Sequence, residues 1–225
     1  MIERIVKDGY NSSIFEGARF CGKYEIPYLG NTDVLTPKDM IPFEKRHLIK
    51  DKKGVYIHFY MKDESFIQVI RHPEKYIDEL NEFEGIITPD NSIYRNMMLG
   101  QQIMNTIYNR GIGFYYKKHG LKVIPNVRWG DKRTYEFCFE GLEKGAVYSI
   151  STYGCIRSKK DKEHFKNGLE EFIRRLKPKK ILVHGAMPSI IFDDYKGLTE
   201  FVHYEDRLTR VHRKYNKLSQ ESEVA

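Results

Sequence analysis

Short apolar runs alternate with longer segments of helical periodicity along most of the chain. The apolar runs are rich in β-branched and aromatic residues and lie at 55–60, 85–88, 122–125, 146–151 and 180–184, with a weaker one at 200–204. Four of them are apolar at consecutive positions, which is typical of strands covered by helices on both faces. The pattern predicts an α/β fold with a mostly parallel sheet of about five to seven strands and flanking helices, as an open sheet or a partly closed barrel.

The clearest helix is expected at residues 160–176, ahead of Pro178. Five apolar residues recur there on one face, and all are expected to face the sheet: Phe165, Leu169, Phe172, Ile173 and Leu176. A second helix is expected to begin near Pro73. A third is expected at 96–109, ended by Gly111 and Gly113, with five apolar side chains inward: Met97, Met98, Ile103, Met104 and Ile107.

The chain of 225 residues suits one domain. Proline and glycine break every period in the first fifty residues, so residues 1–50 are expected to form an irregular wrap, with one strand near 32–35. We expect a single α/β domain over residues 1–215. Residues 216–225 lack apolar spacing and are expected to be a mobile tail.

Composition limits where the protein acts. No segment approaches the roughly 20 apolar residues of a membrane helix, and the first residues lack the apolar run of a secretory signal. The three cysteines, Cys21, Cys138 and Cys155, are widely spaced and form no metal-binding or redox pair. We therefore expect a cytoplasmic protein with free thiols and no membrane partner.

Positive charge is concentrated late in the sequence. From Arg157 to Lys180 there are ten Lys or Arg and four Asp or Glu, a local net charge of +6. A second basic run contains Arg207, Arg210, Arg213, Lys214 and Lys217. Such a surface attracts polyanions, although a solvated helix and a charged tail explain the same composition.

Polar and ionisable residues follow the predicted strands. They are Asp90 and Ser92 after the second strand, Asn126, Arg128, Trp129 and Asp131 after the third, Ser151 and Thr152 after the fourth, and His184 at the end of the fifth. The carboxyl ends of parallel strands meet at one edge, where ligands bind. The sequence therefore predicts a shared site there.

The residue types suggest roles within that site. Arg128 offers a fork for a phosphate or carboxylate, and the neighbouring Trp129 offers a surface for stacking. Asp90 and His184 are the candidates for proton transfer, and the other residues are expected to contact the ligand. Helix capping, turn formation and core packing explain the same residues without a ligand. No phosphate-binding loop, dinucleotide-binding or zinc motif is present, so the sequence identifies no cofactor and assigns no metal ligands. A metal among Asp90, Asp131 and His184 stays open, because it requires that their side chains converge.

Four segments resemble an uncharacterised domain family of phages and bacterial mobile elements. They are residues 122–130 (KVIPNVRWG), 138–141 (CFEG), 149–152 (SIST) and 181–185 (ILVHG), and the similarity spans about residues 15–205. Members of that family share an Ile-Pro-Asn-Val-x-Trp core and the Thr-Pro-Asp-x-Ser segment found here at 88–92. The resemblance implies a phage or mobile-element origin, and no established activity comes with it.

Two functions from different classes remain. In the first, a phosphate-bearing ligand, a nucleotide or a nucleic acid, binds at the strand ends and undergoes hydrolytic or transfer chemistry. In the second, the protein is not an enzyme and binds a host protein or DNA through its basic helix and tail.

Overall fold

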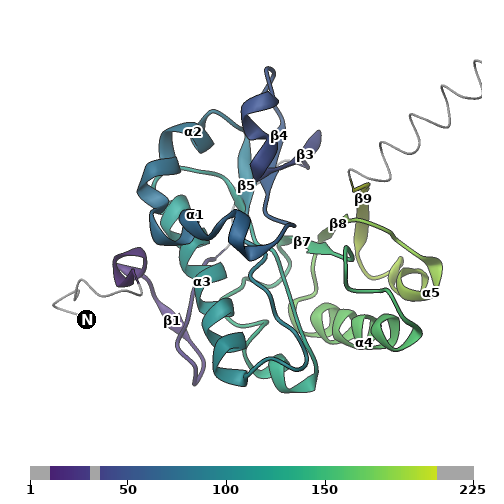
Figure 1. The fold of residues 1–225 in the computed structure, drawn as a ribbon. Coiled ribbons are helices and arrows are strands. Elements are labelled where there is room, and N and C mark those ends of the chain that lie inside the picture. Colours follow the sequence, from purple (N-terminus) through teal and green to yellow (C-terminus); the bar gives the residue numbers. More distant parts are fainter. Residues whose placement is uncertain (1–10, 31–35, 207–225) are drawn as a thin grey trace, which may run out of the picture.

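The structure is a computed structural model that describes residues 11–30 and 36–206 (Figure 1). The described residues form a short antiparallel pair and two parallel sheets. The pair is β1 (Phe20–Cys21) with β2 (Ile26–Pro27), the four-stranded sheet is β3 (Asp39–Pro42), β4 (Val55–His58), β5 (Gly85–Ile87) and β6 (Val123–Ile124), and the three-stranded sheet is β7 (Val147–Ser151), β8 (Lys180–His184) and β9 (Glu200–Tyr204). The strand expected near 32–35, the second basic run and the tail lie outside the described residues.

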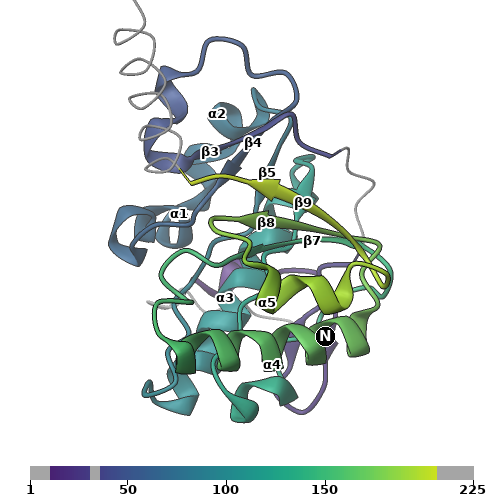
Figure 2. The same cartoon turned by 90° about the vertical axis from the view of Figure 1, so that its right-hand side faces the viewer.

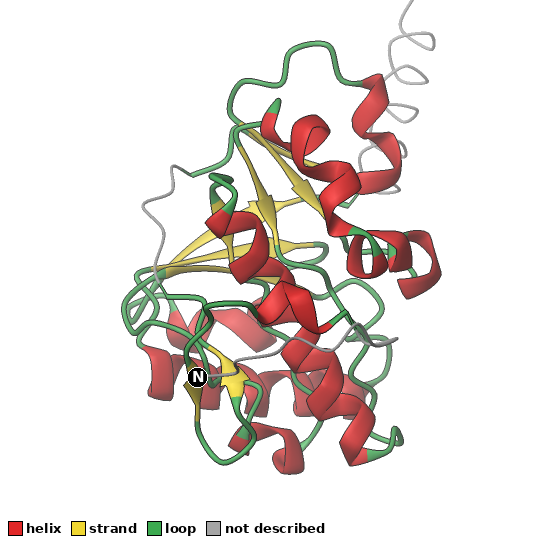
Figure 3. Cartoon of the chain, turned by 90° about the vertical axis from the view of Figure 1, so that its left-hand side faces the viewer, coloured by secondary structure: helices red, strands yellow, loops and turns green. Residues whose placement is uncertain are grey.

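The α/β class and the parallel direction of the strands are confirmed, but a single sheet of five to seven strands is not found. Regular pairing ends just after β6. Pro125 has no N–H to donate, and the next amide, that of Asn126, donates to the Thr88 hydroxyl at 2.8 Å. Only one bridge, between Asn126 and Ser149, joins the two parallel sheets in the described part of the chain. Figure 3 shows the strands of the two sheets running in different directions.

Helices cover one face of each parallel sheet, whereas the strand pattern predicts helices on both faces. The other faces of the two sheets share an apolar cluster, which explains why their strands are apolar at consecutive positions. The helices are α1 (Ile67–Arg71), α2 (Ile77–Asn81), α3 (Leu99–Lys118), α4 (Lys159–Leu176) and α5 (Ser189–Phe192), with 3₁₀ turns that include η2 (Phe43–Leu48), η4 (Pro73–Tyr76) and η5 (Lys132–Glu136). The helix expected near Pro73 is a 3₁₀ turn, η4, that continues into α2. Figure 2 shows α4 and α5 together on one side of the three-stranded sheet.

Helix α4 matches its prediction within one residue. Its apolar stripe is buried throughout, with exposed fractions of 7% or less at Phe165, Leu169, Phe172, Ile173 and Leu176. Ser158 begins the helix with a capping box, in which its side chain accepts from the amide of Asp161 and the Asp161 carboxylate accepts from the amide of Ser158. The spacing of apolar residues therefore predicted the buried face of α4 correctly.

Helix α3 differs from its prediction because it runs through both glycines to Lys118. A Cβ at Gly111 would lie 2.2 Å from Cε1 of Phe15, and one at Gly113 would lie 2.6 Å from Cγ2 of Thr88. These glycines let the helix approach its neighbours closely and do not end it.

The buried face of α3 is also different from the expected one. Met98 is 71% exposed and Met104 is 38% exposed. The residues that α3 buries are mostly polar or small, and they include Gln102, Thr106, Asn109 and Arg110. Hydrophobic periodicity fails here because hydrogen bonds, not apolar contacts, hold much of this face.

One apolar cluster is shared by both parallel sheets. It joins Met40 of β3, Tyr56 of β4, Ile87 of β5, Ile124 of β6, Leu182 of β8 and Tyr204 of β9. The Tyr204 hydroxyl donates to the carbonyl of Pro37, just before β3, at 2.6 Å. The last described strand therefore reaches the first strand of the four-stranded sheet. In the described ranges, no helix is both long and apolar enough to cross a membrane.

Candidate functional site

A cavity of about 1280 Å³ lies at the carboxyl ends of the parallel strands. Every parallel strand of the described chain contributes a residue to its wall, either from its last positions or from the loop that follows. These residues are Pro42, His58, Asp90, Arg128, Ser151, His184 and Glu205. Convergence of the strand ends places side chains from distant parts of the sequence around one space.

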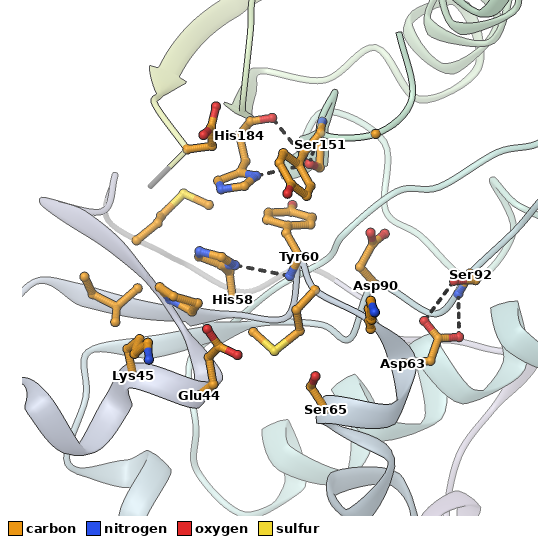
Figure 4. A pocket seen from close by; sticks show the side chains of 18 of the residues that line it. Glu44, Lys45, His58, Tyr60, Asp63, Ser65, Asp90, Ser92, Ser151 and His184 are labelled. Atoms are coloured by element: carbon orange, nitrogen blue, oxygen red, sulfur yellow. Dashed lines mark hydrogen bonds between the residues drawn. The ribbon is translucent and has the colours of Figure 1, made fainter. Parts of the chain in front are cut away.

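Two histidines meet at the centre of this wall. The ring centroids of His58 and His184 are 4.6 Å apart, and the ring of Tyr60 stacks on His184 at 4.7 Å with an interplanar angle of 19°. Figure 4 shows His58, Tyr60 and His184 gathered beside one another. The amide of Tyr60 donates to Nδ1 of His58 at 3.2 Å, so this nitrogen is an acceptor and the ring proton of neutral His58 is on Nε2.

His184 is also in contact with a serine hydroxyl. Oγ of Ser151 lies 3.1 Å from Nδ1 of His184, and the amide of Tyr153 donates to the same Oγ at 3.2 Å. Strands β7 and β8 are neighbours in register, with Ser151 paired to His184, which fixes this contact. A hydroxyl beside an imidazole can pass a proton to it or receive one from it.

A buried ion pair lies beside the histidines. Nη1 of Arg128 donates to Asp90 Oδ2 at 3.0 Å, and Nδ2 of Asn126 donates to the other carboxylate oxygen at 2.8 Å. Burial raises the pKa of Asp90, although Arg128 and Asn126 act in the opposite direction. Burial also opposes the charge of Arg128, but Asp90 keeps the Arg128 pKa above its ordinary value. Arg128 is therefore a permanent cation on the cavity wall.

A second buried cation lies behind this pair. Arg110 is 1% exposed and donates to the carbonyl oxygens of Cys138 at 2.7 Å and Asn126 at 3.3 Å. Burial lowers its pKa to about 10, so it remains charged at neutral pH. No carboxylate pairs with Arg110 among its contacts in the described residues, whereas Arg128 has Asp90. The buried charges of this region therefore sum to a positive value, which favours an anionic ligand.

A smaller cavity of about 190 Å³ adjoins the large one. The two share four wall residues, namely Tyr94, Arg128, Ser151 and Gly154. Nowhere in residues 11–30 and 36–206 do three or more His, Cys, Asp or Glu side chains gather in a group suited to a metal ion.

Comparison with known proteins identifies the family of this chain. Residues 18–205 match the family described as "Domain of unknown function (DUF4417)". The chain belongs to this family. The Gene 1 protein of Mycobacterium phage L5 is 33% identical over 185 residues, which are 82% of this chain and 81% of that protein. The Gene 1 protein of Mycobacterium phage D29 is 30% identical over 154 residues, 68% of this chain and 57% of that protein. No solved structure matches.

The matched region contains every described cavity residue up to Glu205. Of the residues predicted from the sequence, Asp90, Ser92, Arg128, Ser151 and His184 line the large cavity. Asn126 is fully buried and lies behind the cavity wall, where its side chain donates a hydrogen bond to Asp90. The strand-end rule therefore brings most of the predicted residues together.

Three predicted residues lie elsewhere. Trp129 is 7% exposed and packs against Phe165 at 5.0 Å, so its ring fills the core beside α4 and borders only the smaller cavity. Asp131 caps η5 by accepting from the amide of Arg133 at 3.0 Å. Thr152 is buried and donates to the carbonyl of Ala186 at 2.6 Å, which holds two strand-end loops together. These are the structural roles that turn and core residues commonly have.

Sequence reasoning missed His58 and Tyr60. The signal was available, because His58 ends an apolar strand (VYIH) in the same way that His184 ends another (ILVH). It also missed the wall formed by η2, where Figure 4 places Glu44 and Lys45 opposite the side that holds Asp63. That wall comes from the irregular segment, where no periodicity indicates which side chains face inward.

The basic helix is partly neutralised by its neighbours. Lys166 pairs with Asp194 at 2.6 Å, and Arg174 and Arg175 both pair with Glu171. Cationic side chains of α4 do lie outside the buried stripe, as the periodicity predicts. Nucleic-acid binding by this surface stays a prediction.

Proposed function

We propose that this protein binds a phosphate-bearing ligand, a nucleotide or the end of a nucleic acid, in the large cavity at the strand ends. The observation that supports this proposal most directly is the hydrogen bonding of Arg128. In the described residues its side chain has one hydrogen-bond acceptor, Asp90, which Nη1 reaches at 3.0 Å. Nη2 and Nε are left for an acceptor from outside the protein, and Arg favours planar, paired contacts with phosphate oxygens.

The size of the cavity supports the same ligand. A volume of about 1280 Å³ exceeds what an isolated phosphate needs and suits a ligand of nucleotide size or larger. Lys45, Lys62 and Arg157 also line the wall, together with six carboxylate residues: Glu44, Asp63, Glu64, Asp90, Glu205 and Asp206. The anion is therefore expected at Arg128 and not along the whole wall. Arg110 adds a fixed positive charge from behind.

The histidine pair supports proton transfer on the bound ligand. His184 contacts the Ser151 hydroxyl through Nδ1, and His58 carries its proton on Nε2 in the neutral form. A phosphoryl group held by Arg128 would then have proton donors and acceptors close by, as hydrolysis or transfer requires. We assign Asp90 to holding Arg128 in place, since both of its oxygens already accept hydrogen bonds.

We also infer that the two parallel sheets act as one partly closed barrel. Their shared apolar cluster and the bond from Tyr204 to Pro37 support this. Residues 124–129 join the sheets and supply Asn126 and Arg128 to the site, which is a physical reason to expect the Ile-Pro-Asn-Val-x-Trp segment in the phage relatives.

Binding measurements on two arginine variants test the proposal. Calorimetric titration with ribose 5-phosphate and adenosine 5′-monophosphate should detect binding to the wild type, and Arg128→Ala should abolish it. Arg174→Ala removes an equal charge from the outer face of α4 and should change nothing. Circular dichroism checks that both variants remain folded.

Two results would count against the proposal. One is unchanged affinity in a folded Arg128→Ala protein. The other is binding that survives this change but is lost when Lys159, Lys160 and Lys162 are replaced by Gln. The second result would instead favour the non-enzymatic reading, in which a host protein or DNA binds the basic helix.

A further inference from the structure

The smaller cavity has a different character from the large one. Its volume of about 190 Å³ is far above the roughly 10–15 Å³ that one water needs. Four apolar side chains form its inner wall, namely Ile93, Val127, Trp129 and Phe165. All four are at most 7% exposed, so they form a fixed surface of the core.

Polar groups lie around this apolar surface. Arg95 pairs with Asp161, and both line the cavity together with His164. Tyr94 also lines it and is 54% exposed. A flat ring that is apolar on its faces and polar at its edge fits such a lining, since its faces can pack on aromatic carbon while its edge meets hydrogen-bonding groups.

Arg128 stands where the two cavities meet. It lines both of them, as does Ser151, whose hydroxyl contacts His184. A group held by Arg128 is therefore beside the histidine pair on one side and beside the apolar wall of the smaller cavity on the other. A ligand that joins a phosphate to a flat heterocycle can use both spaces at once.

The geometry points to the smaller cavity as a nucleobase subsite. A nucleoside phosphate, free or at the end of a strand, binds with its base against the wall of Trp129 and Phe165 and its phosphate at Arg128. This inference rests on the proposed phosphate site and extends it by assigning the smaller cavity as the place where the base binds. It excludes ligands such as sugar phosphates as the preferred class.

The test compares ligands that differ only in the base. Adenosine, guanosine, cytidine and uridine 5′-monophosphates are titrated alongside ribose 5-phosphate. At least one nucleotide should bind about tenfold more tightly or better, because stacking of a base on aromatic side chains commonly contributes that much. Cys155→Phe places a ring in the smaller cavity and should remove this advantage while leaving ribose 5-phosphate binding intact. Cys155→Ala is the matched control that keeps the cavity open.

Tryptophan fluorescence gives a second measurement on the unaltered protein. Trp129 is the only Trp in the chain and lines the smaller cavity, so in the folded protein its emission responds to a ligand bound there. The preferred nucleotide should change its emission, and ribose 5-phosphate should not. A 5′-phosphorylated tetranucleotide distinguishes the source of the ligand, since tighter binding than the mononucleotide identifies a strand end and weaker binding identifies a free nucleotide.

The outcomes separate the two proposals. Equal affinity for ribose 5-phosphate and all nucleotides overturns the nucleobase subsite and leaves the phosphate site standing. A nucleotide advantage that persists in folded Cys155→Phe, with no change in Trp129 emission, overturns the subsite as well. Absence of binding by every phosphate compound overturns the phosphate site itself.

Discussion

Replacing Gly168 with Ala should destabilise the protein, although the same change usually stabilises a helix. Gly168 lies inside α4, where Ala is favoured over Gly by about 1 kcal/mol on helix propensity. A Cβ at this position would lie 2.0 Å from Nε1 and 2.1 Å from Cδ1 of Trp129. The indole has little room to retreat, because it packs against Phe165 at 5.0 Å and Phe172 at 6.1 Å.

Overpacking of a buried site costs about 1–3 kcal/mol, and a contact this short belongs at the upper end of that range. After the gain in helix propensity is subtracted, Gly168→Ala should lower the free energy of unfolding by about 2 kcal/mol. For a chain of this size the melting temperature should fall by about 4–8 °C. Urea denaturation followed by Trp129 fluorescence and far-UV circular dichroism measures the change.

Gly100→Ala is the matched control, since nothing lies within 4 Å of a Cβ built at Gly100 in α3. This change should be neutral or slightly stabilising. A Gly168→Ala protein as stable as the wild type would refute the reasoning. It would show that the Trp129 ring can move away from α4 without cost, so the loop that carries Arg128 and Trp129 is not held tightly against this helix.

Three further predictions concern buried or paired groups. Arg110→Met should lower the free energy of unfolding by about 3 kcal/mol or more in urea titrations, because it leaves buried carbonyl oxygens without donors; a change below 1 kcal/mol would contradict this. Hydrogen bonds from Arg174, opposed by burial and helped by Arg175, lower the pKa of Glu171 from 4.5 to about 2, so the stability that the carboxylate contributes is present above pH 4.5 and is lost as the pH falls toward 2. Glu171→Gln should therefore be less stable by about 1 kcal/mol at pH 7, and the difference should disappear in melts at about pH 2. Burial raises the pKa of Cys138 to about 12, so mass spectrometry after treatment with a thiol reagent at pH 8 should find it unmodified until urea unfolds the protein, and early modification would contradict its burial.

The strands and the helix α4 were predictable because their signals are local. Consecutive apolar residues give the strand ladder from β4 to β8, and a single apolar stripe gives the buried face of α4. The order of parallel strands then brings Asp90, Arg128, Ser151 and His184 to one edge without further information. These steps need only the period of the pattern and the direction of the chain.

The remaining features depend on contacts between distant segments. The packing of Gly111 on Phe15 and the hydrogen bonds of Arg110 give α3 a buried polar face that no hydrophobic pattern reports. Trp129 is drawn into the core because Gly168, 39 positions later, leaves room for its ring. Pro125, which lacks a donor, lies where the two sheets meet, and only one bridge joins them there in the described residues. Sequence spacing contains none of these distances.

The bridge at Asn126 places the joint between the two sheets directly behind the wall of the cavity. The Asn126 backbone pairs with Ser149 of the second sheet, and its side chain holds Asp90, which in turn holds Arg128. Separating the two sheets at this joint would therefore also displace Asp90 and Arg128 from the cavity wall. A ligand that contacts both Arg128, in the segment between the two sheets, and His184, at the end of β8, would therefore stabilise the joint. Hydrogen exchange in β6 and β7 should slow when it binds, ahead of any change in the outer strands.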